Sequence, residues 1–200
     1  MTNQIHLNHL SPDRVAHFEA TGWRAYYDRH WLGLLRLIIN LCHEQFGIPF
    51  PAAWLAAYYV TRASVAWVPI NHDEEVVRAY YERFYRLAQR YSGLRFDPAR
   101  AAALELSYNV EHRRLSGCLD KSSFIEAMVA LHCELFELTP AQARPSAELR
   151  VQATHIVDQI TSKTSADPEA DWARLEANLR ACYRSIQSEM EGNAVSTTKG

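Results

Sequence analysis

The chain has 200 residues, 48% of them hydrophobic, which suffices for one substantial hydrophobic core. Its 21 basic and 23 acidic side chains give a net charge of −2, so charge provides no reason to expect nucleic acid or an anionic membrane as a partner. The four cysteines form no CxxC pair, which predicts free thiols rather than a zinc site or a disulfide framework.

Two further features of the sequence bear on where the protein works. Residues 1–13 lack a basic segment followed by an apolar one, so they have no signal-peptide pattern. The longest apolar stretch, residues 30–42, contains Arg36 and is too short to cross a bilayer. We therefore expect a cytoplasmic protein that binds neither nucleic acid nor a membrane, and the sequence leaves a homo-oligomer open.

Proline, glycine and capping residues mark the ends of the predicted helices. In chain order these are a short helix opened by Ser11 and Pro12, then residues 22–46, 51–68, 71–92, 98–116, 123–136, 146–161 and 168–190. Ser123 and Glu126 fit a capping box, and Thr139 with Pro140 is expected to start a single turn. No segment alternates with the period of a strand.

The pattern predicts an all-α protein, a single-domain bundle of about seven or eight helices. The helical domain is expected to span residues 11–191. Residues 1–10 are expected to be flexible, and residues 192–200 are small and polar enough to predict a disordered tail.

The predicted helix at 98–116 differs from the others because it is apolar on two sides. Between those sides, Glu105, Asn109 and His112 form a polar stripe. A helix with two apolar sides usually lies in the middle of a protein, where every buried polar group needs a partner or a ligand. We therefore expect this helix to be central and its polar stripe to be cut off from bulk water.

A chemical site is the bolder interpretation of this stripe. His132 lies within the apolar arc of the helix at 123–136, and we hypothesise that Glu105, His112 and His132 converge as a metal or proton-transfer site, with Asp28 as a further member. Iron or haem would be the cofactor in a metal-assisted oxidation. The alternatives are structural: a hydrogen-bonded core histidine at position 132, and an ordinary ion pair between Asp28 and Arg24.

The helix at 51–68 combines small residues with aromatic ones that can line a pocket. Arg62 lies in the middle of this apolar helix, and a buried arginine needs a carboxylate from the protein, such as Asp28 or Glu105, or from a ligand. An arginine whose head reaches solvent is the alternative. The predicted substrate-binding residues are Arg62, Tyr58, Trp67, Tyr108, Asn109 and Asp28.

Two functional hypotheses follow. In the first, an internal aromatic pocket binds or converts a small, largely apolar molecule, with Arg62 holding an anionic end and Glu105 or His112 moving protons. In the second, the chain is a non-catalytic interaction module, and its buried polar residues only fix the packing of the helices. A transcription regulator is less favoured, because the sequence has no basic recognition helix.

Overall fold

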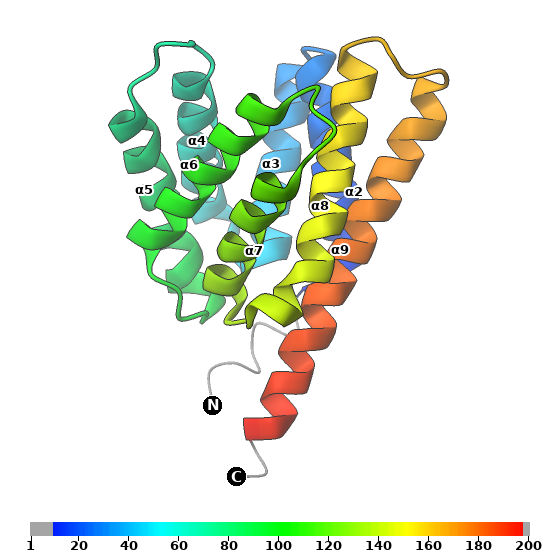
Figure 1. Cartoon of the computed structure of the whole chain (residues 1–200). Helices are drawn as coiled ribbons and strands as arrows, with labels where there is room; N and C mark the ends of the chain where they lie inside the picture. Colours follow the sequence, from blue (N-terminus) through cyan, green and yellow to red (C-terminus); the bar gives the residue numbers. More distant parts are fainter. Residues whose placement is uncertain (1–9, 198–200) are drawn as a thin grey trace.

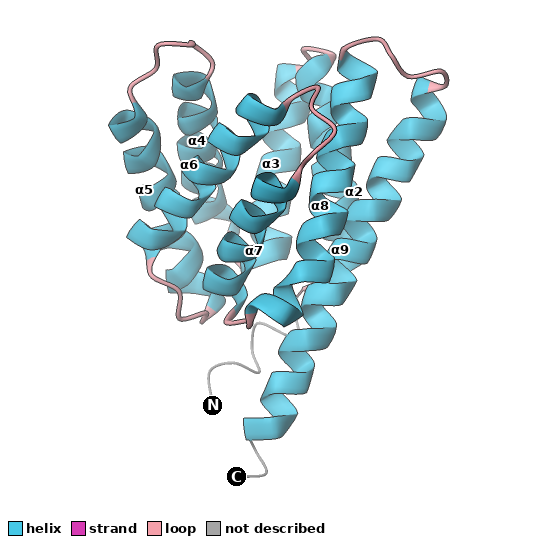
Figure 2. Cartoon of the chain, in the orientation of Figure 1, coloured by secondary structure: helices cyan, strands magenta, loops and turns pink. Residues whose placement is uncertain are grey.

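Eight helices follow one another along residues 10–197, the part of the chain that the computed structural model describes, and no strand occurs in that range (Figures 1 and 2). The all-α, single-domain fold predicted from the sequence is confirmed. The flexible segment predicted at 1–10 lies, apart from residue 10, outside the described residues. The helices are α2 (Pro12–Tyr27), α3 (Trp31–Phe46), α4 (Phe50–Trp67), α5 (Glu74–Ser92), α6 (Pro98–Leu115), α7 (Ser122–Phe136), α8 (Pro140–Thr161) and α9 (Pro168–Thr197).

The helices form a closed ring. Each helix packs against the next one along the chain, and α9 returns to pack against α2 (Figure 1). Short connections make neighbouring helices antiparallel, so α2, α4, α6 and α8 all end at the same side of the ring. No helix of the described residues is both long enough and apolar enough to span a membrane.

Local capping explains several of the helix ends. The side chain of Asp73 accepts hydrogen bonds at the start of α5, and Asp97 does the same for α6. Gly47 and Gly93 have positive φ angles of 64° and 73° and end α3 and α5 in the left-handed conformation. The predicted capping box at Ser123 is absent from α7, whereas Thr139 and Gln142 form one at the start of α8.

The long helix predicted at 22–46 is wrong, because the chain breaks between α2 and α3. Arg29 has a φ of 58°, and His30 precedes the first residue of α3. Residues 23–32, which contain the break, include neither glycine nor proline, so the usual signal is missing. The first turn of α3 contains Gly33, which packs closely against His30. An added Cβ at position 33 would lie only 2.8 Å from the Nδ1 atom of His30.

Two other helices extend further than predicted. The chain does not stop after a single turn at Pro140, because α8 continues to Thr161 with Pro145 inside its first two turns. There the lost N–H costs one hydrogen bond near the helix start rather than at its centre. At the other end of the chain, α9 passes the predicted end at Met190 and is helical to Thr197, which includes most of the segment predicted to be disordered.

The helix predicted to be central, α6, is one member of the ring. It packs against α5 and α7, and its inner face reaches toward α8 through side chains. Its buried residues lie on more than one side, as its two apolar stripes indicated, and are Ala101, Ala102, Leu106, Tyr108 and Leu115. The polar stripe of α6 is therefore at the inside of a ring, partly screened from water but not in the middle of a solid core.

Candidate ligand-binding groove and the polar interior

Two side-chain pairs join α6 to α8 across the inside of the ring. The Nε2 atom of His112 lies 3.0 Å from Oδ1 of Asp158, and the hydroxyl of Tyr108 lies 3.0 Å from Oγ1 of Thr154. In both pairs the partners are 46 residues apart, because the two helices are parallel and one turn separates the pairs. The ring of His112 also stacks on Phe124 at 5.4 Å between ring centres.

Arg150 is the main positive charge of the interior. Its guanidinium group forms an ion pair with the carboxylate of Glu19, to which the Tyr183 hydroxyl donates a hydrogen bond of 2.7 Å. The guanidinium carbon also lies 4.9 Å from the ring centre of Trp23. Because Glu19 compensates this charge, Arg150 is not left to seek an anionic ligand, and the group joins α2, α8 and α9.

Glu105 lies in a second cluster, between α5 and α6. Its Oε2 atom accepts a hydrogen bond of 2.9 Å from the hydroxyl of Tyr85, which is buried. Burial raises the pKa of Glu105, an effect that the Tyr85 hydrogen bond and the charge of Arg150 oppose. One turn along α6, the side-chain amide of Asn109 donates to the hydroxyl of Tyr81 at 3.0 Å.

His132 is a core histidine. It is buried on α7, and its Nδ1 atom lies 2.8 Å from Oγ of Ser146 on α8. Burial, with a smaller contribution from the positive charge of Arg150, lowers the pKa of His132 to about 3, so its imidazole is neutral at physiological pH. The contact with Ser146 satisfies one ring nitrogen, as the structural alternative for this residue predicted.

The predicted metal or proton-transfer residues therefore do not meet at one centre. Glu105, His112 and His132 belong to three separate hydrogen-bonded pairs, and Asp28 is an exposed residue whose carboxylate lies 3.8 Å from Arg24. Within residues 10–197 no three histidine, cysteine or acidic side chains are placed to hold a metal ion. Glu105 and His112 are seven residues apart in the sequence, which separates them by about 10 Å along the helix axis. A helical wheel shows only the angle between two residues and not this separation.

The α4 residues predicted to line an internal pocket are not gathered inside the ring. Arg62 is exposed, with its guanidinium carbon 5.1 Å from the ring centre of Tyr80, so of the two interpretations the arginine whose head reaches solvent is the correct one. Tyr58 is half exposed, and Trp67 is covered by the guanidinium group of Arg113 at 3.9 Å. The pattern misled because the fully buried residues of α4 are all alanines, while Phe50, Trp54, Tyr58 and Val65 point outward.

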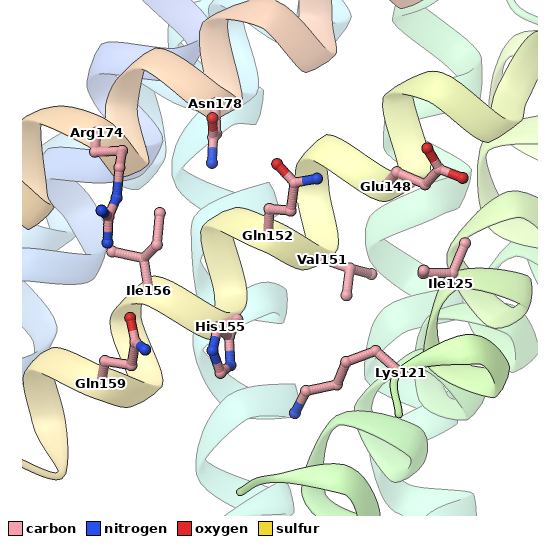
Figure 3. Close-up of a pocket in the computed structure, with 10 residues that line it drawn as sticks. All are labelled: Lys121, Ile125, Glu148, Val151, Gln152, His155, Ile156, Gln159, Arg174 and Asn178. Carbon is pink, nitrogen blue, oxygen red and sulfur yellow. The ribbon is translucent and has the colours of Figure 1, made fainter. Parts of the chain in front are cut away.

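An open groove does occur on the outer surface of the ring, over α8 and between α7 and α9 (Figure 3). Its volume is about 590 Å³, within the range of small-molecule sites. The groove faces away from Arg150, which is on the opposite side of α8. The residues that line it are Lys121, Ile125, Glu148, Val151, Gln152, His155, Ile156, Gln159, Arg174 and Asn178.

The unusual member of this lining is His155. Its Nδ1 atom is buried and has no hydrogen-bond partner. Three residues along α8, the Oδ2 atom of Asp158 is also buried and unpaired. Unpaired buried polar atoms are rare in folded proteins and call for a specific explanation.

One positive charge lies near His155, and the lining also holds the carboxylate of Glu148. Figure 3 shows the amino group of Lys121 on the same side of α8 as the His155 ring. That amino group donates one hydrogen bond, of 2.5 Å, to the carbonyl oxygen of Leu115, which leaves two N–H groups for another acceptor. Arg174 stands further along the groove and pairs with Asp171 at 2.8 Å.

Sequence reasoning missed Arg150, Glu19, Asp158 and His155. Glu19 and Tyr183 are 164 residues apart, and nothing local in the sequence indicates such a contact. Arg150 did have a local signal, because α8 places it on the face of Ala143, Ala147 and Thr154, all of them buried. The predicted helix began at Ser146 rather than Pro140, so it left out Ala143 and the buried face of α8 was not recognised.

Comparison of the chain with protein-family models, with curated proteins and with solved structures gives no match. The functional conclusion therefore depends on the geometry of the groove and of the interior.

Proposed function

We propose that this protein binds a small molecule that carries a carboxylate and a short apolar part, and that the groove over α8 is its site. The observation that carries the proposal is the buried, unpaired Nδ1 atom of His155 in the groove lining. Once the ring turns toward the groove, an imidazole N–H at this atom would donate to a carboxylate oxygen, and the free N–H groups of Lys121 would supply the opposite charge.

The remaining lining suits the other parts of such a ligand. Ile125, Val151 and Ile156 offer apolar contacts along the groove, and the carboxamides of Gln152, Gln159 and Asn178 offer both donors and acceptors. Pockets of this kind combine an apolar wall with a few polar groups that fix orientation. The anionic end expected from the sequence is kept in this proposal, but its anchor moves from Arg62 to Lys121 and His155.

Chemical conversion of the ligand is not part of the proposal. The residues predicted to move protons or hold a metal are paired inside the ring, on the far side of α8 from most of the groove. Metal-assisted oxidation thus gains no support from their arrangement. We place the binding activity in the cytoplasm, because Cys42, Cys118, Cys133 and Cys182 are all free thiols, as expected in a reducing compartment.

A second candidate is the non-catalytic interaction module. It is favoured by the pairing of the interior polar groups, since Glu105, His132 and Arg150 each have a protein partner and need no ligand. This candidate predicts that the groove takes up no small carboxylate, which separates it from the first.

Calorimetric titration with sodium hexanoate, and separately with inorganic phosphate, tests the proposal. We expect hexanoate to bind, and Lys121→Gln and His155→Phe each to weaken binding by about tenfold or more. Lys163→Gln is the matched control, because Lys163 lies outside the groove in the connection between α8 and α9. Equal affinities in all four proteins, or no heat from hexanoate, would contradict the proposal; binding of phosphate alone would point to a different anion.

A further inference from the structure

The outward face of α4 is apolar along its whole length. Five large side chains, the last of them at the C-terminal cap of the helix, are well exposed to solvent: Phe50 (67%), Trp54 (48%), Tyr58 (47%), Val65 (61%) and Val68 (60%). They follow one another at spacings of four, four, seven and three residues, which places them on one side of the helix, together with Thr61. We call these six residues the α4 face.

The opposite side of α4 enters the ring with small residues. Ala53, Ala56, Ala57 and Ala63 are fully buried. The fully buried residues of α4 are thus all small, Tyr59, Val60 and Trp67 pack partly against the core, and the five large apolar residues of the α4 face point at solvent. A contiguous apolar face of this kind marks an interaction site.

The order of side chains along the α4 face matches a second copy of the same face. Its aromatic residues lie in the first half, and its β-branched residues lie in the second half. If two copies pack antiparallel about a two-fold axis near residues 59–60, Phe50 faces Val68, Trp54 faces Val65 and Tyr58 faces Thr61. Each large side chain then meets a small one, as close packing requires. A parallel pair would instead place each aromatic ring against its own copy.

Charge and area agree with this arrangement. Arg62 is the one charged residue of α4, and it lies beside the face, folded over Tyr80 and within 3.4 Å of the Tyr58 hydroxyl. The face itself therefore offers no charge for a charged partner. With about 150–250 Å² per aromatic side chain, the exposed fractions leave roughly 500 Å² of apolar surface on each copy. Two copies would bury roughly 1,000 Å², the area from which specific interfaces begin.

We propose that the α4 face is the interface of a two-fold symmetric homodimer, with the two α4 helices antiparallel. This inference is independent of the groove, which lies on α7, α8 and α9. The proposed dimer leaves the groove of each copy accessible, because α4 packs against α3 and α5 in another part of the ring (Figure 1).

Sedimentation equilibrium over a range of protein concentrations tests the interface. We expect the wild-type chain to dimerise, and Trp54→Glu to raise the dimer Kd by about a hundredfold or more, because a carboxylate would be buried in an apolar contact. Leu119→Glu is the matched control, since Leu119 is an exposed apolar residue in the connection between α6 and α7. Circular dichroism of each variant reports whether the fold is kept.

A charge-exchange variant tests the antiparallel register. Val65→Lys alone should also weaken the dimer. The double variant Trp54→Glu/Val65→Lys should recover at least part of the lost affinity, because the introduced carboxylate of one copy would face the introduced ammonium group of the other. The two positions are about three turns apart on one helix, so the new charges cannot pair within a chain.

Two outcomes would overturn the proposal outright: a wild-type chain that stays monomeric, or a dimer that Trp54→Glu does not weaken. Monomers that bind phosphatidylcholine vesicles through this face would overturn it in favour of a membrane contact.

Discussion

Arg150 of α8 and Glu19 of α2 form an ion pair inside the helix ring, and the hydroxyl of Tyr183 from α9 completes it. The three helices that meet here include the pair α2 and α9, which closes the ring. The first and last helices of the described chain are thus joined by a charged group as well as by apolar packing.

Loss of the Glu19 charge should strongly destabilise the fold. Glu19→Gln leaves the guanidinium group of Arg150 buried beside a neutral partner, and we expect the free energy of unfolding to fall by about 3–5 kcal/mol. Urea denaturation followed by circular dichroism measures the change.

The control for this variant is an exposed ion pair. Glu169→Gln removes the partner of Arg24 on the surface, where solvent screens the interaction, and its effect should be much smaller. The double variant Glu19→Leu/Arg150→Met should recover most of the stability lost in Glu19→Gln. Equal effects of Glu19→Gln and Glu169→Gln would show that the interior pair is not buried as described.

The burial of His132 predicts a specific dependence of stability on pH. Its folded-state pKa is lowered to about 3, below the unfolded value near 6.5. Between these values the unfolded chain binds a proton that the folded chain does not, so stability is lost as pH falls from about 6.5 toward 3. The contribution approaches about 1.4 kcal/mol per pH unit.

Chemical denaturation of His132→Gln at several pH values measures this contribution. The variant should show a shallower loss of stability between pH 6.5 and 4 than the wild-type chain. His17→Gln serves as the control, because His17 is an exposed histidine on α2. An unchanged slope in His132→Gln would mean that the imidazole is not buried in its neutral form.

The burial of Glu105 predicts a dependence of stability on pH that is opposite in sign to that of His132. Its pKa is raised by burial, so it contributes stability that is present below the unfolded pKa and lost as pH rises through the folded value. Glu105→Gln retains an oxygen to accept the Tyr85 hydrogen bond and removes the charge. We expect this variant to be at least as stable as the wild type at pH 7 and to show no advantage at pH 4. Thermal denaturation at the two pH values checks the difference, and a large loss of stability at pH 7 would contradict it.

Arg62 provides a test of the surface position of its side chain. Arg62→Gln should change the free energy of unfolding by no more than about 0.5 kcal/mol, because an exposed guanidinium group leaves no buried partner behind. The measurement is made at low protein concentration, so that self-association through α4 does not contribute. A loss of several kcal/mol would instead support the buried arginine that the sequence pattern suggested.

The sequence was sufficient for the fold class and for most helix ends, because proline, glycine and capping residues act locally. Asp97 predicts the start of α6, and Gly93 the end of α5, from residues a few positions away. The break at Arg29 was missed, since a left-handed residue other than glycine leaves no such local signal.

The site was harder to predict, because it depends on which helices become neighbours. The polar stripe of α6 was expected to be cut off from bulk water, but it is only partly screened, and its partners Tyr85 and Asp158 come from two different helices. A helical wheel places His155 on the side of α8 opposite Arg150, and nothing in the sequence shows that α7 and α9 flank it there. The apolar character of α4 suggested a buried pocket, and the structure instead places its large side chains outside the ring.

The most direct test of ligand binding is the nitrogen-15 spectrum of the histidine side chains during addition of hexanoate. If a carboxylate enters the groove and accepts a hydrogen bond at Nδ1 of His155, the ring resonances of His155 should move progressively to saturation while those of exposed His17 stay in place. If the His155 resonances remain unchanged at concentrations of hexanoate that leave the protein folded, the groove is not the binding site of such a molecule.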